Sequence, residues 1–416
     1  MKKLCRILSV ASFLTALLAT ARAEAAENVK IGVIYPLTGN AASAGQSAKD
    51  AVNLGAEIVN SAHPDLKTLP LGATAGLPNL GGAKIELDEA DHQGNPQVGQ
   101  QQTVRLITQD HVVAMLGSYH SSVSLVATAV AERQGIPYLV ANSVAQNITG
   151  RGFKWTFRTT PIASDFAKAY AGFLTDLKNS GRKIEKIAVI NENTDYGTSV
   201  AASILEAAKA ANINVAAQIP YNANSSDVSA QVIQLKTLQP DAIIFVSYTA
   251  DTILYFRTLK NLDYLPPIII GDDAGFSDPT FIPNAGELAQ GAINRSAFDI
   301  GKPGSNSYIV NQLFKTKYGR DLDDTSARWM QGFFVLADAI NRAGSTEPDK
   351  IQAALQATDL KPDQLIMGYN GVKFDSTGQN TLASTFLIQL QGKQYVSIWP
   401  TNLATGKLEL PMKGWR

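Results

Sequence analysis

The chain contains very few of the residues that form disulfides or bind metal ions. Cys5 is its single cysteine, so no disulfide can form within one chain. The four histidines show no spacing typical of metal ligands, and no H-E-x-x-H motif occurs; they are His63, His92, His111 and His120. We therefore expect a fold held by its hydrophobic core alone, with no metal and no cofactor.

Sequence motifs of nucleotide binding and hydrolysis are also missing. No Gly-Lys pair is followed by Ser or Thr, no G-x-G-x-x-G follows a strand pattern, and no G-x-S-x-G occurs. The nearest nucleophile candidate is Ser121 beside His120, but adjacent side chains in a turn usually point apart. The sequence thus favours a protein that is not an enzyme, and a secreted hydrolase using this pair is kept as an alternative.

Long hydrophobic runs and an excess of one charge are absent beyond the first 23 residues. These begin with basic residues, continue with the apolar run 7–19 and end in an A-x-A cleavage site at 21–23, which is typical of a signal peptide. Cleavage would remove four of the 36 basic residues, leaving 32 against 36 acidic ones, a formal charge near −4. Such a charge argues against nucleic acid or an anionic membrane as partner. Since Cys5 precedes the apolar run, it is not a lipid-anchor cysteine, and we expect export to the periplasm.

The sequence is rich in alternating strand and helix patterns. Strands are expected at 29–35 and 84–90, and the continuous apolar run 112–116 is typical of a strand buried on both faces of a parallel sheet; helical patterns follow them. After residue 161 the alternation starts again. Further strands are expected at 186–191, 215–219, 241–246, 267–270, 372–375, 385–391 and 395–399, and helices at 163–177, 199–211, 228–238, 251–262, 308–318, 326–341 and 348–356. The pattern predicts two α/β domains with doubly wound parallel sheets, and 63–82 reads as a surface loop.

Two polar turns in the first domain predict a ligand crevice. The serine-rich turn 118–122 follows the strand 112–116, and the helical spacing after it places Ser121 or Ser122 at a helix N-cap. A helix N-terminus offers N–H groups to an anion such as a carboxylate, although plain capping explains the serines as well. The turn 141–144 follows the next short strand, and turns at the carboxyl ends of parallel strands line ligand sites in α/β sheets.

Similar turns in the second domain offer aromatic and acidic side chains. Tyr196 and Tyr248 follow buried strands, and Asp272 and Asp273 follow the apolar run 268–270, where a carboxylate can pair with an ammonium group. The candidate ligand-binding residues of both domains are Tyr119, Ser121, Ser122, Asn142, Ser143, Val144, Tyr196, Tyr248 and Asp273.

Several short motifs, taken in order, resemble one protein family. They are Ile31-Gly32-Val33 with 36–39, the turn 117–122, the stretch 147–153 with 157–159, Asp195-Tyr196-Gly197, and 371–375 with Gly378. Their order over residues 29–399 is similar to that in the periplasmic substrate-binding proteins of branched-chain amino acid (Leu/Ile/Val-type) ABC transporters, which have the type I periplasmic-binding fold.

The resemblance implies two lobes joined by three hinge crossovers, near 157–161, 292–298 and 367–374. The first lobe would comprise residues 24–158 and 296–370, and the second 159–295 and 371–416. The ligand would close the lobes by a hinge motion, and the closed monomer would dock on an ABC transporter permease in the inner membrane.

The resemblance also implies roles for individual residues. Ser121 would hold a carboxylate, Tyr196 and Tyr248 would cover the ligand, and Asp273 would pair with an ammonium group. Val144 stands where a threonine is usual, and His120 stands where a disulfide cysteine is usual. We expect an amino acid or related carboxylate; an aromatic or other organic acid without an amine, or a small amide, remains open. A ligand-sensing module is disfavoured because the sequence shows neither a membrane segment nor an output domain.

Overall fold

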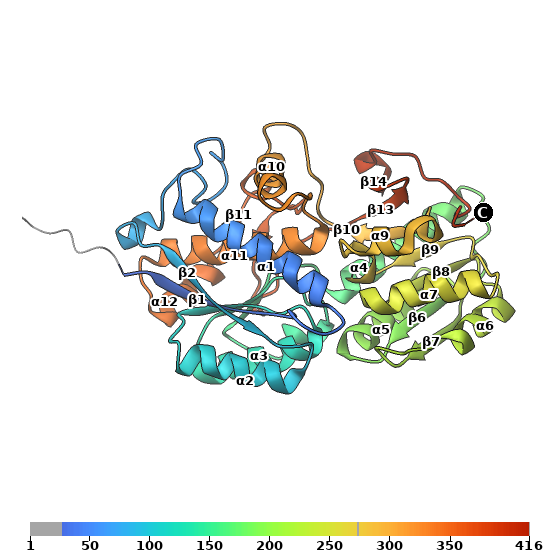
Figure 1. Ribbon diagram of the computed structural model, residues 1–416, viewed down its shortest axis with the longest axis horizontal. Coiled ribbons are helices and arrows are strands. Elements are labelled where there is room, and N and C mark those ends of the chain that lie inside the picture. The colour runs from blue at the N-terminus through green and yellow to red at the C-terminus, as the bar shows by residue number, and fades with distance from the viewer. Residues whose placement is uncertain (1–26, 273, 416) are drawn as a thin grey trace, which may run out of the picture.

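Two parallel sheets, each covered by helices, form the two halves of the molecule (Figure 1). The structure is a computed structural model and describes residues 27–272 and 274–415; the predicted signal peptide and Asp273 lie outside these residues. The first sheet has the order β2-β1-β3-β4-β5 and is parallel throughout. Its strands are β1 (Val29–Tyr35), β2 (Ile85–Asp91), β3 (Ala114–Gly117), β4 (Tyr138–Val140) and β5 (Thr156–Arg158).

Helices cover both faces of the first sheet. Ile31 and Val33 belong to the core that includes α1 (Ala42–Asn60) and α11 (Asp324–Ala343). Ile34 of the same strand belongs to the core on the opposite face. The helices on that face are α2 (Pro96–Thr108) and α3 (Ser121–Gln134), and α10 (Asn306–Tyr318) and α12 (Pro348–Gln356) complete this half of the molecule. Because neighbouring residues of a strand point to opposite faces, one buried strand supplies both cores.

The second sheet has the order β14-β13-β10-β9-β8-β6-β7; its strands are parallel except β13, which runs antiparallel to both of its neighbours, β10 and β14. Its strands are β6 (Ile187–Glu192), β7 (Val215–Tyr221), β8 (Ala242–Val246), β9 (Ile269–Gly271), β10 (Ile293–Ser296), β13 (Phe386–Gln391) and β14 (Gln394–Trp399). Its main helices are α4 (Ala163–Asn179), α5 (Asp195–Ala210), α6 (Ser229–Leu238) and α7 (Thr249–Asn261), with the short α8 (Ala274–Ser277) and α9 (Phe281–Ala285). The predicted α/β fold with two doubly wound parallel sheets is confirmed.

The run 372–375 does not join the second sheet, although the sequence groups it with the terminal strands. Its β12 (Val372–Lys373) pairs with β11 (Asp359–Leu360) in a small antiparallel sheet, and further along the chain Gln379 bridges to Arg158 of β5. The N–H of Asn380 also donates to the Arg158 carbonyl over 2.9 Å. The lobe boundaries remain a prediction, and these contacts favour a third crossover between residues 380 and 386.

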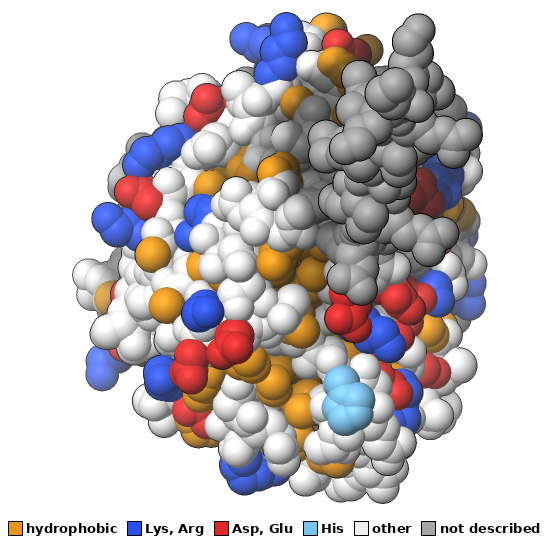
Figure 2. All heavy atoms as spheres, turned by 90° about the vertical axis from the view of Figure 1, so that its left-hand side faces the viewer, with side chains coloured by type: hydrophobic (Ala, Val, Ile, Leu, Met, Phe, Trp, Pro, Cys, Tyr) orange, Lys and Arg blue, Asp and Glu red, His pale blue; other side chains and the backbone are white. Residues whose placement is uncertain are grey.

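The loop 63–82 lies against the helices of the first half. It consists of turns and the short 3-10 helix Pro78–Leu80, and it buries Leu66 and Leu77. The N–H of Asn79 donates to Asn341 Oδ1 over 3.0 Å, which ties the loop to α11. On the part of this end that the described residues form, basic and acidic side chains are interspersed (Figure 2). Within residues 27–272 and 274–415, no helix has the length and apolarity needed to cross a membrane.

Candidate ligand-binding site

A small cavity lies between the two sheets. The first half contributes Tyr119, Ser121, Asn142, Ser143 and Val144, and the second contributes Tyr196, Tyr248, Ala274 and Arg295. Most of these residues follow the carboxyl ends of β3, β4, β6, β8 and β9, the edge where open α/β sheets bind ligands. Seven of the nine residues selected from the sequence thus surround one cavity. Ser122 does not line it, and Asp273 lies outside the described residues.

The N-terminus of α3 lies at the wall of this cavity. The helix begins at Ser121 and its N-cap is His120, so the prediction that Ser121 or Ser122 is the cap is wrong. His120 has an extended backbone, and its carbonyl already accepts from the N–H groups of Val123 and Ser124, over 3.1 and 3.0 Å. The N–H groups of Ser121 and Ser122 fall in the first turn, where helices supply no carbonyl partner. They and the helix dipole favour an anion at this point.

Ser143 and Asn142 play different parts in the second turn. The Ser143 hydroxyl lies 2.7 Å from the Ser118 carbonyl, 3.0 Å from the Tyr119 carbonyl and 2.6 Å from Ser124 Oγ. It therefore joins the two polar turns. The Asn142 side chain is buried, and its Nδ2 has no hydrogen-bond partner among the described residues. An amide donor left unpaired in this way costs roughly 1–3 kcal/mol, so a ligand acceptor that meets it gains affinity.

An aromatic cluster forms another wall and spans both halves. The ring centroid of Tyr248 lies 4.9 Å from that of His120, 5.3 Å from that of Tyr196 and 6.0 Å from that of Tyr119. These separations are typical of packed aromatic pairs. The Tyr119 hydroxyl donates to the Ala274 carbonyl of the other half over 3.4 Å. The cluster therefore closes one side of the cavity with rings from both halves.

Two buried histidines pack next to this aromatic cluster. His92 and His120 are both buried, and their rings meet edge to face at 5.4 Å. Burial lowers the pKa of His120 to about 4. Burial, and secondarily the charge of His120, hold the pKa of His92 well below its usual value. Both rings are therefore neutral at pH 7 and bring no positive charge to a ligand.

Arg295 and Asp272 form a buried ion pair beside the cavity. Arg295 Nε donates to Asp272 Oδ1 over 2.9 Å, and the two side chains are 1% and 0% exposed. The hydroxyls of Tyr170 and Tyr196 also donate to the Asp272 carboxylate. The sequence analysis did not select Arg295. The sequence feature that could have pointed to Arg295 is a charged residue within a short strand. The structure shows that all four residues of that strand, Ile293–Ser296, are buried.

Hydrogen bonds also join the two halves outside the cavity. The Ser43 hydroxyl of α1 donates to the Asp278 carboxylate, which follows α8. The Gln146 N–H donates to Ser199 Oγ of α5 over 2.9 Å. These contacts show that the two halves are closed on each other.

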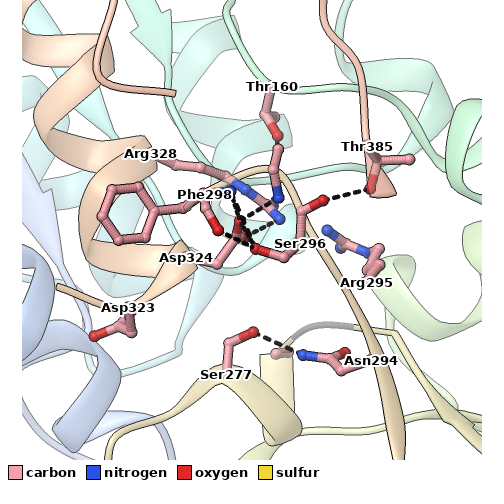
Figure 3. A network of polar contacts seen from close by, with 12 residues as sticks. Thr160, Ser277, Asn294, Arg295, Ser296, Phe298, Asp323, Asp324, Arg328 and Thr385 are labelled. Atoms are coloured by element: carbon pink, nitrogen blue, oxygen red, sulfur yellow. Dashed lines mark hydrogen bonds and ion pairs between the residues drawn. The ribbon is translucent and has the colours of Figure 1, made fainter. Parts of the chain in front are cut away.

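One face of α11 contacts two of the segments that connect the halves (Figure 3). Asp324 accepts from the N–H groups of Ala297 and Phe298 over 2.6 and 3.0 Å. One turn later, Arg328 Nη1 lies 3.4 Å from Thr160 Oγ1, and Arg328 also pairs with Asp324. Gln331 Oε1, a further turn along, accepts from the N–H of Ile366 over 2.7 Å. The spacing of 324, 328 and 331 places these side chains on one helix face.

Two lobes closed around a small cavity, with two of their connections held against one helix, define a ligand-binding protein of the hinge-closing class. Residues 28–394 match the model of the family described as periplasmic binding protein. A Leu/Ile/Val-binding protein homolog 8 of Brucella suis is 32% identical over 98% of this chain and 99% of its own length. The chain belongs to the periplasmic binding protein family, in its Leu/Ile/Val type, as the sequence motifs predicted.

Solved structures agree with this fold. A leucine binding protein from Thermotoga maritima matches with a TM-score of 0.76 at 22% identity, covering 90% of this chain and 100% of that one. A solute binding protein from R. palustris in complex with benzoate matches with a TM-score of 0.74 at 16% identity, covering 89% and 95%. The type I periplasmic-binding fold is thus confirmed, and the protein is a periplasmic solute-binding protein that captures a small ligand for an ABC importer.

Proposed function

We propose that the cavity binds an amino acid or a related small carboxylate, with the carboxylate at the N-terminus of α3. The observation that carries this proposal is the group of donors at one end of the cavity. The first-turn N–H groups of Ser121 and Ser122 have no carbonyl of their own helix, and Asn142 Nδ2 has no partner among the described residues. Donors of this kind are strongest toward a charged acceptor.

The other cavity residues have complementary roles in this proposal. Ser143 holds the two turns together through its hydroxyl and acts on the ligand through them. Tyr196 and Tyr248 cover the ligand with their rings. Asp273 remains our candidate partner for an ammonium group; it lies between Asp272 and the cavity residue Ala274, outside the described residues.

The proteins that this chain is similar to point to an amino acid or an aromatic acid as the ligand. The names of the relatives and neighbours, Leu/Ile/Val-binding, leucine binding and benzoate-bound, cover both classes.

An organic acid without an amine is the second candidate. Two observations favour it: Val144 places an apolar side chain where the family motif has a threonine hydroxyl, and Arg295 lines the cavity. In either case we propose export by the segment 1–23, a monomeric and non-catalytic protein, and delivery of the ligand to a permease in the inner membrane.

A thermal-shift screen of the protein, unfolded and refolded to remove carried-over ligand, tests the proposal. The probes are α-amino acids, aromatic acids, short dicarboxylates and amides. A ligand at 100 times its Kd stabilises the folded state by about 2.7 kcal/mol. If carboxylates raise the Tm and their amides do not, the proposal stands. If no carboxylate raises it, the proposal is wrong.

Two substitutions locate the carboxylate. Asn142→Ala removes the unpaired donor and is expected to lower the affinity at least tenfold, because a hydrogen bond to a charged group contributes roughly 1.5–3 kcal/mol. Ser122→Ala is the matched control, since it keeps the backbone N–H and its side chain does not line the cavity. Equal affinities in both variants would place the carboxylate elsewhere.

A further inference from the structure

Three buried serine hydroxyls form a closed cycle of hydrogen bonds beside the two polar turns of the cavity. Ser118, Ser124 and Ser143 are each at most 2% exposed, and of the three Ser143 lines the cavity. Ser124 Oγ lies 2.8 Å from Ser118 Oγ and 2.6 Å from Ser143 Oγ. Ser143 Oγ closes the cycle, because it lies 2.7 Å from the Ser118 carbonyl. It also lies 3.0 Å from the Tyr119 carbonyl.

These distances fix the direction of each hydrogen bond in the cycle. A carbonyl oxygen only accepts, so the Ser143 hydroxyl must donate to the two carbonyls that it approaches. Its single hydrogen is then used, and Ser124 must donate to Ser143 Oγ. By the same reasoning Ser118 donates to Ser124. Hydrogen bonds that run in one direction strengthen one another, so the cycle keeps the Ser143 hydrogen on the carbonyls.

The cycle engages acceptors of the polar turns and leaves donors for a ligand. The Ser118 and Tyr119 carbonyls already accept from Ser143. The N–H groups in the first turn of α3, by contrast, have no carbonyl of their own helix to bond. Asn142 Nδ2 on the second polar turn has no partner among the described residues. This arrangement favours a carboxylate, which only accepts, over an amide, which also brings hydrogens to donate.

Stability alone is a weak reason for three buried hydroxyls. Replacing both partners of a buried hydrogen bond by apolar groups of the same shape is often nearly neutral. The place of Ser143 at the cavity wall supplies a reason of another kind. Without its hydroxyl, the Ser118 and Tyr119 carbonyl oxygens would lose this donor beside the cavity. Their partial negative charges would then repel a carboxylate and accept from an amide N–H.

We infer that Ser143 is a specificity-determining residue that selects a carboxylate over its amide by covering the Ser118 and Tyr119 carbonyls. Its hydrogen is used within the protein, so Ser143 acts through these carbonyls and does not donate to the ligand. The inference deepens the proposed function and rests on it, because it takes the ligand carboxylate to lie at the N-terminus of α3.

Calorimetric titration of the refolded protein with three acid–amide pairs tests the inference. The pairs are leucine with leucinamide, benzoate with benzamide, and succinate with succinamide. The measured quantity is the affinity for the acid divided by the affinity for its amide, and displacement of the acid gives the affinity of a weak amide. Ser143→Ala should lower this ratio at least about tenfold, because the acid loses affinity and the amide gains it. Ser143→Thr keeps the hydroxyl and should keep the ratio within about threefold of the wild-type value, even if its methyl group weakens both ligands.

Two other serines supply matched controls. Ser124→Ala removes a hydroxyl of the same cycle but leaves Ser143 on the carbonyls, so it should change the ratio by less than about threefold. Ser203→Ala removes a buried hydroxyl that donates to the Ser199 carbonyl of its own helix, over 3.0 Å, and should change neither affinity. Circular dichroism checks the fold of each variant. If Ser143→Ala does not fold, the double variant S124A/S143A removes both partners of one hydrogen bond and should show the same fall in the ratio.

The outcomes separate this inference from the proposed function. If Ser143→Ala changes the affinities for acid and amide by the same factor, the inference is overturned while carboxylate binding stands. The inference is also overturned if Ser124→Ala lowers the ratio as much as Ser143→Ala does, because the carbonyls are still covered in that variant. If none of the three acids binds the wild-type protein, the proposed function fails and this inference fails with it.

Discussion

Ser43 of α1 donates its hydroxyl to Asp278 of the other lobe, so one side chain from each lobe meets at the closed interface. Asp278 is held in turn by the N–H of Thr280, over 2.8 Å. Because Ser43 and Asp278 belong to lobes that separate on opening, this hydrogen bond stabilises only the closed form.

Ser43→Ala is therefore expected to weaken ligand binding about fivefold. A hydrogen bond of this type contributes about 1 kcal/mol, and here the contribution is lost only from the closed, ligand-holding form. Stopped-flow measurement should show a faster dissociation of ligand. Gln46→Ala is the matched control, because Gln46 lies in the same helix and donates to Asp50 of that helix. A dissociation rate equal to that of the wild type would exclude a role of Ser43 in holding the closed form.

Acid should destabilise the protein through His120. Its folded-state pKa is about 4, against about 6.5 for an unfolded histidine. Below pH 6.5 the unfolded chain takes up a proton that the folded chain excludes, so stability falls until the pH reaches about 4. By pH 5 this loss amounts to about 2 kcal/mol. His92 shifts in the same direction and adds to it.

Urea unfolding at pH 7 and pH 5 measures this loss. His120→Gln should lose less stability than the wild type between the two pH values. His111→Asn is the control, because His111 is exposed and asparagine tolerates its positive φ of 57°. If His120→Gln and the wild type lose the same amount, the buried ring is not the source of the acid sensitivity.

Arg158 connects the second polar turn of the cavity with a hinge segment. It donates to the Ala145 carbonyl, to Thr149 Oγ1 and to Gln379 Oε1, over 2.7 Å in each case. Burial lowers its pKa to about 9, so it is still charged at pH 7. Gln379 in turn donates from Nε2 to the Thr160 carbonyl of the first connection.

Arg158→Met should lower the free energy of unfolding by about 3 kcal/mol or more, because it leaves several buried acceptors without donors. Thermal unfolding should show a Tm lower by several degrees, and ligand affinity should fall because the turn 141–145 loses its support. Arg182→Ala, at an exposed site, should change the stability by at most about 0.5 kcal/mol. A Tm equal to that of the wild type would show that water replaces the guanidinium.

The sequence by itself determined the two sheets and the edge at which ligands bind. The apolar run of β8 and the helical spacing of apolar residues in α11 can be recognised from residues close together in the sequence. This is possible because the backbone geometry of strands and helices sets the period at which side chains return to one face. Polar residues directly after strands, such as Tyr196 and Tyr248, could be selected because carboxyl ends of parallel strands share one edge.

Only the tertiary structure decided which side chains face the cavity and which are engaged by the protein. Ser143 uses its hydroxyl to join two turns, Asp272 is saturated by Arg295 and two tyrosines, and the segment around Gln379 lies beside β5. Each of these facts depends on a distance between residues far apart in the chain; Arg158 and Gln379, for example, are 221 positions apart. Local periodicity carries no information on such distances. They are fixed when the chain folds and the buried polar groups find their partners.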